Sequence, residues 1–179
     1  LMREAMAGAM RRGGGTISLW KDFSMAGTVE QNLARLGISL PATVAPAANY
    51  VPARRTGNQL YVSGQVPAEA GKDKFTGKLG SDYTIEEGQA AARLCAINIL
   101  AQLKQALDGD LDRVTGVIRL GGFVNAEPDF KDHPKVINGA SDLMVEVFGE
   151  AGRHARAAVG CYSLPRNVPV EVDAIFEVK

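Results

Sequence analysis

The sequence has little of what most nucleic-acid-binding proteins and metalloenzymes depend on. Its 179 residues include two histidines and two cysteines, and aromatic residues make up 6%. Twenty basic residues are balanced by twenty acidic ones, so the overall charge gives no support for binding nucleic acid or an anionic membrane surface. No apolar run approaches the roughly 20 residues that a membrane-spanning helix needs. Neither nucleic acid nor a membrane is therefore expected as a partner.

Motifs with a defined chemistry are also missing. The two cysteines, Cys95 and Cys161, cannot make a disulfide framework, so a reduced, cytoplasmic setting is expected. No cluster of cysteine, histidine and carboxylate residues has metal-ligand spacing, and no metal site is expected. There is no phosphate-binding loop, dinucleotide-binding glycine motif or nucleophile elbow. From the residues alone, the interpretation stops at a soluble α+β domain that forms oligomers.

What the sequence does contain begins with a segment unlike the rest. Residues 1–25 hold paired arginines and a triple glycine and show no lasting periodicity. Three interpretations stay open: a targeting segment, because arginines are present and acids are few; sequence read from upstream of a natural start at Met25; or an arm that packs on a neighbouring subunit. We favour the second, because a clean helical pattern begins directly after Met25.

Hydrophobic periodicity predicts the elements of the remaining chain. Residues 26–49 hold a short amphipathic helix (28–36) and a linker containing prolines. Strands are expected where β-forming residues gather or apolar residues alternate, at residues 50–55, 60–63, 114–124, 157–161 and 168–178. Helices are expected from a capping box at 84–87 to residue 109, and from about residue 134 to 149. Two helices burying one stripe each against one face of a mixed sheet give an α+β fold, and valine-rich strands left uncovered indicate an oligomer.

Three stretches of residues 50–179 add a family resemblance. They read YVPARRTGNQLYVSGQVP at 50–67, FVNAEPDFKDHPKVIN at 123–138 and RAAVGCYSLPRNVPVEVDAI at 156–175. Their order and spacing resemble the RidA (YjgF) family of enamine and imine deaminases. The segment NGASDLMVEVFGEAGRHARAAVG at 138–160 is similar to a branch of that family labelled endoribonuclease L-PSP-like.

The resemblance implies a fold, an assembly and a reaction. Family members are homotrimers of a chorismate-mutase-like fold, with a mixed sheet, two main helices on one face and clefts between subunits. They hydrolyse 2-aminoacrylate and related enamines or imines to 2-keto acids and ammonia, as 2-iminobutanoate/2-iminopropanoate deaminases do. They use no metal and no organic cofactor. A small 2-imino or 2-keto acid in an inter-subunit cleft is thus the expected ligand.

The same resemblance implies roles for individual residues. Arg156 falls on the arginine that binds the substrate carboxylate, and Glu171 falls on the glutamate that positions the attacking water. The family's other cleft positions fall on Tyr50, Ser63, Gly64 and Asn138. The chemistry is consistent, because a guanidinium fork binds a planar carboxylate bidentately and a carboxylate can pass a proton to a leaving amine.

Structural interpretations of these residues stay open at this point. Glu171 shares its strand face with Asp173 and Glu177, which is also the pattern of an ordinary polar sheet face. The cleft positions could equally be a core tyrosine, the end of a strand and a solvent-facing helix residue. One departure from the family is plain, because Ala158 stands where many members have a cysteine. A redox switch is therefore not expected, whereas hydrolysis does not depend on that cysteine.

A simple pairing hypothesis bears on the site. If the last two strands paired as a hairpin around residues 164–168, Arg156 would lie opposite about residue 176. Glu171 would then lie roughly 16 Å away along the strand. The two side chains would not meet within one chain, and a shared site would need residues from two subunits.

Three functions from different classes remain. The first is hydrolytic deamination of reactive 2-enamine or 2-imine acids, favoured because Arg156 and Glu171 are both present. The second is a regulatory trimer that binds a keto acid without turnover. The third is the endoribonuclease activity attached to the branch name, which the zero net charge and the lack of a histidine pair disfavour.

Overall fold

The computed structural model describes residues 28–43 and 48–179, so the segment 1–25 lies outside the described residues. Within the described part, five strands form one mixed sheet in the order β1-β2-β7-β5-β6. These strands are β1 (Ala53–Thr56), β2 (Gln59–Gln65), β5 (Val114–Asn125), β6 (Ala155–Cys161) and β7 (Val170–Val178). The other elements are α2 (Thr28–Arg35), α3 (Ile85–Ala106) and α4 (His133–Phe148), a small hairpin of β3 (Ala68–Glu69) and β4 (Lys72–Asp73), and the 3₁₀ turns η1 (Leu111–Arg113), η2 (Gly149–Gly152) and η3 (Pro165–Asn167).

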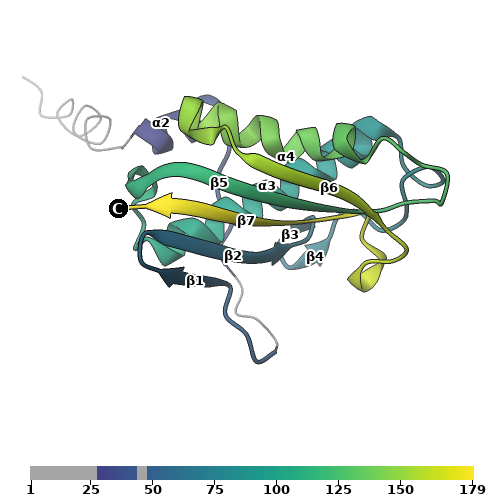
Figure 1. The fold of residues 1–179 in the computed structure, drawn as a ribbon, viewed down its shortest axis with the longest axis horizontal. Helices are drawn as coiled ribbons and strands as arrows, with labels where there is room; N and C mark the ends of the chain where they lie inside the picture. Colours follow the sequence, from purple (N-terminus) through teal and green to yellow (C-terminus); the bar gives the residue numbers. More distant parts are fainter. Residues whose placement is uncertain (1–27, 44–47) are drawn as a thin grey trace, which may run out of the picture.

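The two long helices lie side by side on one face of this sheet (Figure 1). The predicted capping box begins α3: Thr84 accepts from the amide of Glu87, and the carboxylate of Glu87 accepts from the amide of Thr84. Helix α4 begins with Pro134 in its first turn and ends at Gly149, whose φ of 62° suits glycine. The predicted α+β fold, with a mixed sheet and two main helices on one face, is confirmed.

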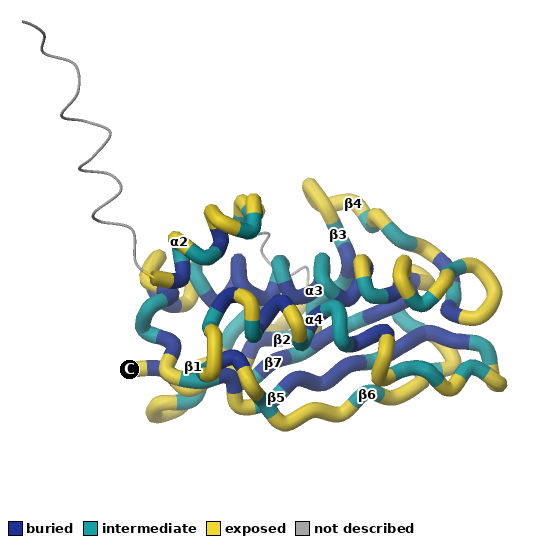
Figure 2. The backbone as a smooth tube through the Cα atoms, turned by 90° about the horizontal axis from the view of Figure 1, so that it is seen from above, coloured by how far each residue is buried: buried dark blue, intermediate teal, exposed yellow. Residues whose placement is uncertain are grey.

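The core lies between the helices and the covered face of the sheet. Along β7 the residues at even positions from Val170 to Val178 are buried, while those at odd positions, from Glu171 to Glu177, are more exposed. This alternation follows from the two-residue period of a strand. Figure 2 shows the buried parts of β2, β5 and β7 beneath the helices and the more exposed edge strand β6. The uncovered face therefore carries the polar half of β7.

The pairing of the last two strands differs from the predicted hairpin. Strand β5 lies between β6 and β7, parallel to β6 and antiparallel to β7. The hairpin hypothesis is therefore wrong. The segment between the two strands contains η3, in which Arg166 and Asn167 have φ of 56° and 55°, and this turn carries the chain past the end of β5.

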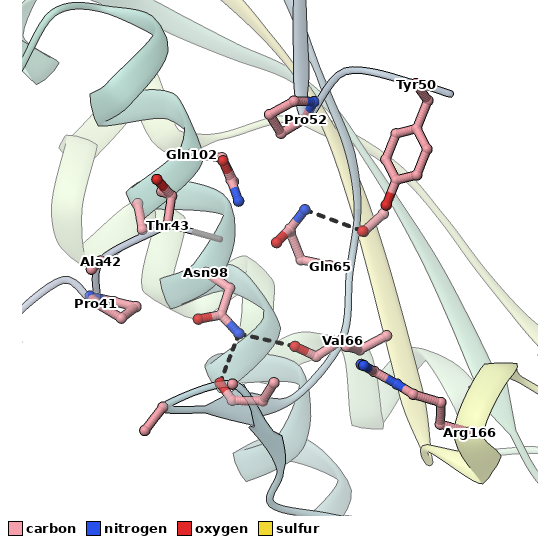
Figure 3. A pocket seen from close by; sticks show the side chains of 15 residues that line it. Pro41, Ala42, Thr43, Tyr50, Pro52, Gln65, Val66, Asn98, Gln102 and Arg166 are labelled. Carbon is pink, nitrogen blue, oxygen red and sulfur yellow. Dashed lines mark hydrogen bonds between the residues drawn. The ribbon is translucent and has the colours of Figure 1, made fainter. Parts of the chain in front are cut away.

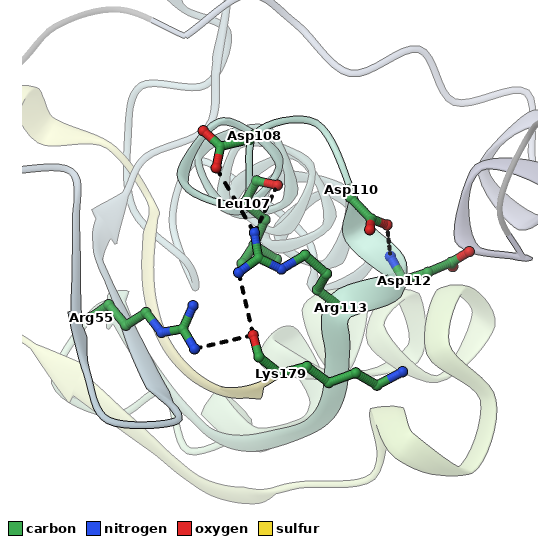
Figure 4. A network of polar contacts seen from close by, with 7 residues as sticks. All are labelled: Arg55, Leu107, Asp108, Asp110, Asp112, Arg113 and Lys179. Atoms are coloured by element: carbon green, nitrogen blue, oxygen red, sulfur yellow. Dashed lines mark hydrogen bonds and ion pairs between the residues drawn. The ribbon is translucent and has the colours of Figure 1, made fainter.

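Polar contacts fix the ends of the elements at one end of the sheet. The carbonyl of Lys179 accepts from Arg55 at 3.1 Å and from Arg113 at 3.3 Å (Figure 4). Asp112, in η1, accepts from the amides of Thr28 and Val29 at the start of α2. Val29 and Leu33 of α2 are buried in the core, so α2 is part of the packed domain. Among the described helices none is both long and apolar enough to cross a membrane.

Close packing of α3 on α4 gives a test of the fold. A Cβ at Gly139 would lie 2.0 Å from the backbone oxygen of Gln89. Alanine normally stabilises a helix interior relative to glycine by about 0.5–1 kcal/mol, but here we expect Gly139→Ala to lower the free energy of unfolding by about 1–3 kcal/mol. Urea denaturation at fixed protein concentration measures it.

The matched control for this prediction is Gly116→Ala. A Cβ at Gly116 would have its nearest neighbour, Glu177 Oε2, at 3.9 Å, so this variant should be as stable as the wild type. A Gly139→Ala protein at least as stable as the wild type would contradict the close helix contact.

Candidate functional site

Arg156 lies on edge strand β6 and its side chain reaches over helix α4. Its Nη1 donates to Asn138 Oδ1 at 2.9 Å and to Ser141 Oγ at 3.0 Å, and its Nη2 donates to the carbonyl of Pro134 at 3.4 Å. The structure thus brings two predicted site residues, Arg156 and Asn138, together. Within the described part of the chain, Nε–H and one of the two Nη2–H groups make no hydrogen bond, so the exposed guanidinium keeps two donors for a ligand.

The charge of Arg156 is not neutralised by a neighbour. Its three hydrogen-bond partners are an amide, a hydroxyl and a peptide carbonyl, and all are uncharged. Among residues 28–43 and 48–179, no acidic side chain forms an ion pair with it. An anion that reaches this guanidinium therefore meets a full positive charge in a fixed orientation.

Glu171 lies on β7, next to the predicted residue Gly64 of β2. A Cβ at Gly64 would lie 2.1 Å from Glu171 Oε1, so the carboxylate occupies space that any side chain at position 64 would fill. Ser63 donates its hydroxyl to the carbonyl of Val51 at 2.8 Å. Tyr50 is 57% exposed, so its interpretation as a core tyrosine is wrong. Four of the predicted residues, namely Glu171, Gly64, Ser63 and Tyr50, thus gather around β2.

This second group borders a hollow on the uncovered sheet face. The hollow has a volume of about 610 Å³, and Tyr50, Ser63 and Gly64 line it together with Arg119 and Asp173. Arg119 and Asp173 form an ion pair of 3.3 Å across β5 and β7. The hollow therefore combines a tyrosine ring, a backbone without a side chain and a neutralised pair of charges.

The electrostatic environment of Glu171 is unusual for this chain. Burial raises the pKa of its carboxyl group above the ordinary value of 4.5, the nearby Asp173 raises it further, and Arg166 lowers it. Such a group can exchange a proton nearer to neutral pH than an exposed glutamate can.

Cys95, by contrast, is fully buried and its pKa is raised well above the usual value, mainly by burial. Burial therefore disfavours the thiolate form that a nucleophilic cysteine needs.

A larger hollow lies on the helix side of Gly64. It has a volume of about 780 Å³ and opens between α3, the end of β2 and Pro41 to Thr43. Figure 3 shows the amide side chains of Gln65, Asn98 and Gln102 directed toward it. Asn98 donates to the carbonyls of Val66 and Ala68. Tyr50 and Gly64 line both hollows.

Arg156 and Glu171 do not meet within the chain. Arg156 is aligned with Leu120 of β5, whereas Glu171 is aligned with Phe123, and β5 lies between the two strands. Arg156 contacts α4 on the face of the sheet that the helices cover. Glu171 is one of the more exposed odd-numbered residues of β7, which lie on the other face. The structure therefore contains two groups of predicted residues, one around Arg156 and one around Glu171.

Three residues near these groups were not predicted from the sequence. Arg166 acts on the pKa of Glu171 from the strained turn η3. Ser141 contacts Arg156, and His154 contacts Ser141. No sequence motif marks the three, although His154 is one of only two histidines in the sequence.

Among the described residues, no group of three or more histidine, cysteine or carboxylate side chains could hold a metal ion.

The raised pKa of Glu171 predicts a pH-dependent cost to stability. The folded state holds this proton more tightly than the unfolded chain, so stability is lost as pH rises from 4.5 through the folded-state pKa. Glu171→Gln should therefore be more stable than the wild type at neutral pH, and its advantage should shrink as the pH falls. Thermal unfolding midpoints between about pH 4 and pH 8 measure this difference.

Glu69→Gln provides the control for this pH series, because Glu69 forms an exposed pair with Lys74 and should show little pH-dependent difference. An advantage of Glu171→Gln that stayed constant with pH, or a loss that grew toward neutral pH, would contradict the assigned environment.

The chain is similar to known proteins along most of its length. Protein TCP17 of Trypanosoma cruzi is 53% identical over 154 residues, which cover 86% of this chain and 96% of that protein. The crystal structure of protein Atu1372 from Agrobacterium tumefaciens has a TM-score of 0.80 at 54% identity and covers 85% of this chain and 93% of its own. A 2-iminobutanoate/2-iminopropanoate deaminase of Dermatophagoides farinae is 26% identical over 142 residues, covering 79% of this chain and 95% of that protein.

A family model described as "YjgF/chorismate_mutase-like, putative endoribonuclease" matches residues 30–177. That match spans most of the chain and includes β2, α4, β6 and β7, which carry the two groups of predicted residues. The chain belongs to the YjgF/chorismate mutase-like family, as the resemblance in its sequence implied.

Proposed function

We propose that this protein hydrolyses small 2-imino acids, and their 2-enamine tautomers, to 2-keto acids and ammonia. The observation that carries the proposal is Arg156, an exposed guanidinium that is oriented by neutral groups and keeps one edge open. The raised pKa of Glu171 supplies a second, complementary feature. The similarity to the deaminase of D. farinae supports the same reaction.

Substrate recognition follows from the open edge of Arg156. The parallel Nε–H and Nη2–H groups match the two oxygens of a carboxylate, which every 2-imino acid carries next to its C=N bond. Two fixed hydrogen bonds hold the reacting carbon at a defined position relative to the protein. A lysine could not provide this geometry, because its ammonium is a point charge.

Glu171 is suited to activating water. As a carboxylate it accepts one proton from water while the oxygen attacks the imine carbon, and it returns that proton to the nitrogen, which gives a carbinolamine. The second proton of the water then passes from the carbinolamine hydroxyl to the nitrogen as the C–N bond breaks. The C=N bond is replaced by C=O, water supplies the oxygen, and ammonia leaves. A pKa raised toward neutrality favours a group that must accept and donate a proton in one cycle.

A complete site requires two copies of the chain. Arg156 and Glu171 lie on opposite faces of the sheet, so the proposal places the ligand between the Arg156 group of one subunit and the Glu171 group of the next. Exposed apolar side chains on β2 and β6, Tyr61 at 41% and Val159 at 48% exposure, support burial of this region in an assembly. A homotrimer satisfies this head-to-tail arrangement with three equivalent clefts.

The proposed function predicts that Arg156→Ala loses deaminase activity. With 2-aminoacrylate generated enzymatically, wild-type protein should accelerate the release of pyruvate and ammonia. Arg156→Ala should lower kcat/KM by about a hundredfold or more, since it removes both charge-assisted hydrogen bonds to the carboxylate. Arg153→Ala is the matched control, because Arg153 is an exposed neighbour paired with Glu150, and it should retain full activity.

Two further measurements, of 2-oxobutanoate binding and of RNA cleavage, separate the remaining functions. A well-folded protein that binds 2-oxobutanoate but hydrolyses no imino acid would replace the proposal with a keto-acid-binding role. RNA cleavage that survives further purification and is lost in Arg156→Ala would favour an endoribonuclease.

A further inference from the structure

A chain of hydrogen bonds leads from the peptide backbone to Arg156. The carbonyl of Gly152 lies 2.6 Å from His154 Nδ1, and His154 Nε2 lies 3.0 Å from Ser141 Oγ. Ser141 Oγ in turn accepts from Arg156 Nη1 at 3.0 Å. Ser141 and His154 are both half-buried. These hydrogen bonds therefore join η2, the start of β6 and the middle of α4 in one continuous network.

The direction of each hydrogen bond follows from chemistry. A carbonyl oxygen only accepts, so His154 Nδ1 must carry the hydrogen that reaches Gly152. In a neutral imidazole the other nitrogen, Nε2, is then an acceptor, and the hydroxyl of Ser141 donates to it. With its hydrogen directed at His154, Ser141 presents lone pairs to Arg156. Each donor in this series of hydrogen bonds thus meets one acceptor.

The positions of the three side chains follow from the local fold. His154 immediately precedes the first residue of β6 and Arg156 is the second, so alternation directs both side chains toward α4. Asn138 and Ser141 are three residues apart on α4 and share one face of the helix. Gly152 lies against α4, because a Cβ there would come within 2.2 Å of the carbonyl of Met144. The carbonyl that orients His154 is therefore held in place by packing.

We propose that Ser141 and His154 are positioning residues that set the orientation of the Arg156 guanidinium. This inference rests on the proposed function, because it assigns these two residues to the same carboxylate-binding group. Asn138 and Ser141 each take one Nη1 hydrogen, and this leaves the Nε–H and Nη2–H edge facing the ligand.

Neutral partners explain why a serine–histidine pair stands here and not a carboxylate. An aspartate or glutamate beside Arg156 would orient the guanidinium equally well, but it would also repel the incoming carboxylate and occupy the same donors. Ser141 fixes the direction of Nη1 without adding a negative charge. His154 in turn fixes the hydroxyl, which would otherwise rotate freely.

Kinetics of three variants test the positioning role. Ser141→Ala and His154→Phe should each raise KM for the imino acid, and Kd for 2-oxobutanoate, by about tenfold, which corresponds to loss of one charge-assisted hydrogen bond. The change in kcat should stay below about threefold, because the lost contact acts on carboxylate binding in the ground state as well as in the transition state.

His154→Gln is the conservative rescue, because its carboxamide oxygen lies near the place of Nε2 and can accept from Ser141. It should restore KM and Kd to within about threefold of the wild type. Ser81→Ala is the control, since Ser81 bonds to Glu127 in a distant loop. Unchanged KM and Kd in both Ser141→Ala and His154→Phe would overturn the proposal, as would a His154→Gln variant as impaired as His154→Phe.

A spectroscopic measurement separates failure of this inference from failure of the proposed function. Two-bond ¹H–¹⁵N correlations at mildly alkaline pH distinguish the tautomers of a neutral imidazole, and the His154→Gln variant assigns the signal, because the sequence contains two histidines. An Nδ1–H tautomer in the wild type that persists in Ser141→Ala, with a changed Nε2 chemical shift because its hydrogen-bond donor is lost, supports this series of hydrogen bonds even if no imino acid is hydrolysed. An Nε2–H tautomer in the wild type would overturn it.

Discussion

Strand β5 lies between β6 and β7, and this placement keeps Arg156 and Glu171 apart within a single chain. Because β5 runs parallel to β6 and antiparallel to β7, Arg156 and Glu171 are separated by a full strand and by the thickness of the sheet. The covered face presents Arg156 beside α4, and the other face presents Glu171 beside Gly64. Under the proposed function each group holds half of the chemistry that an imine hydrolase needs, so a complete site would require two copies of the chain.

Within residues 28–43 and 48–179, neither Arg156 nor Glu171 forms an ion pair. Arg156 is held by an amide, a hydroxyl and a carbonyl, none of which cancels its charge. Glu171 is half-buried and repelled by Asp173, so it holds its proton more tightly than an exposed glutamate. Elsewhere, arginines such as Arg119 and Arg93 are paired with carboxylates. The contrast is what distinguishes the candidate site from the ordinary polar surface of the sheet.

Local signals in the sequence predicted the local structure well. The capping box at Thr84 and the alternation along β7 correspond to real elements, because both depend on residues close in sequence. The hairpin hypothesis was wrong because strand order depends on tertiary packing, and the turn at Arg166 gives no signal of the strand that it passes. Ser141 and His154 are thirteen residues apart and meet only when α4 packs against β6, so spacing alone could not reveal them.

Subunit mixing tests the central claim, that each site is shared between two copies. Arg156→Ala and Glu171→Gln proteins, each inactive by itself, are combined in equal amounts and allowed to exchange subunits, with exchange verified by native mass spectrometry. In random trimers about one quarter of the clefts would join an intact Arg156 to an intact Glu171. A site shared between two subunits predicts recovery of about a quarter of wild-type activity. Verified exchange without recovery would contradict it.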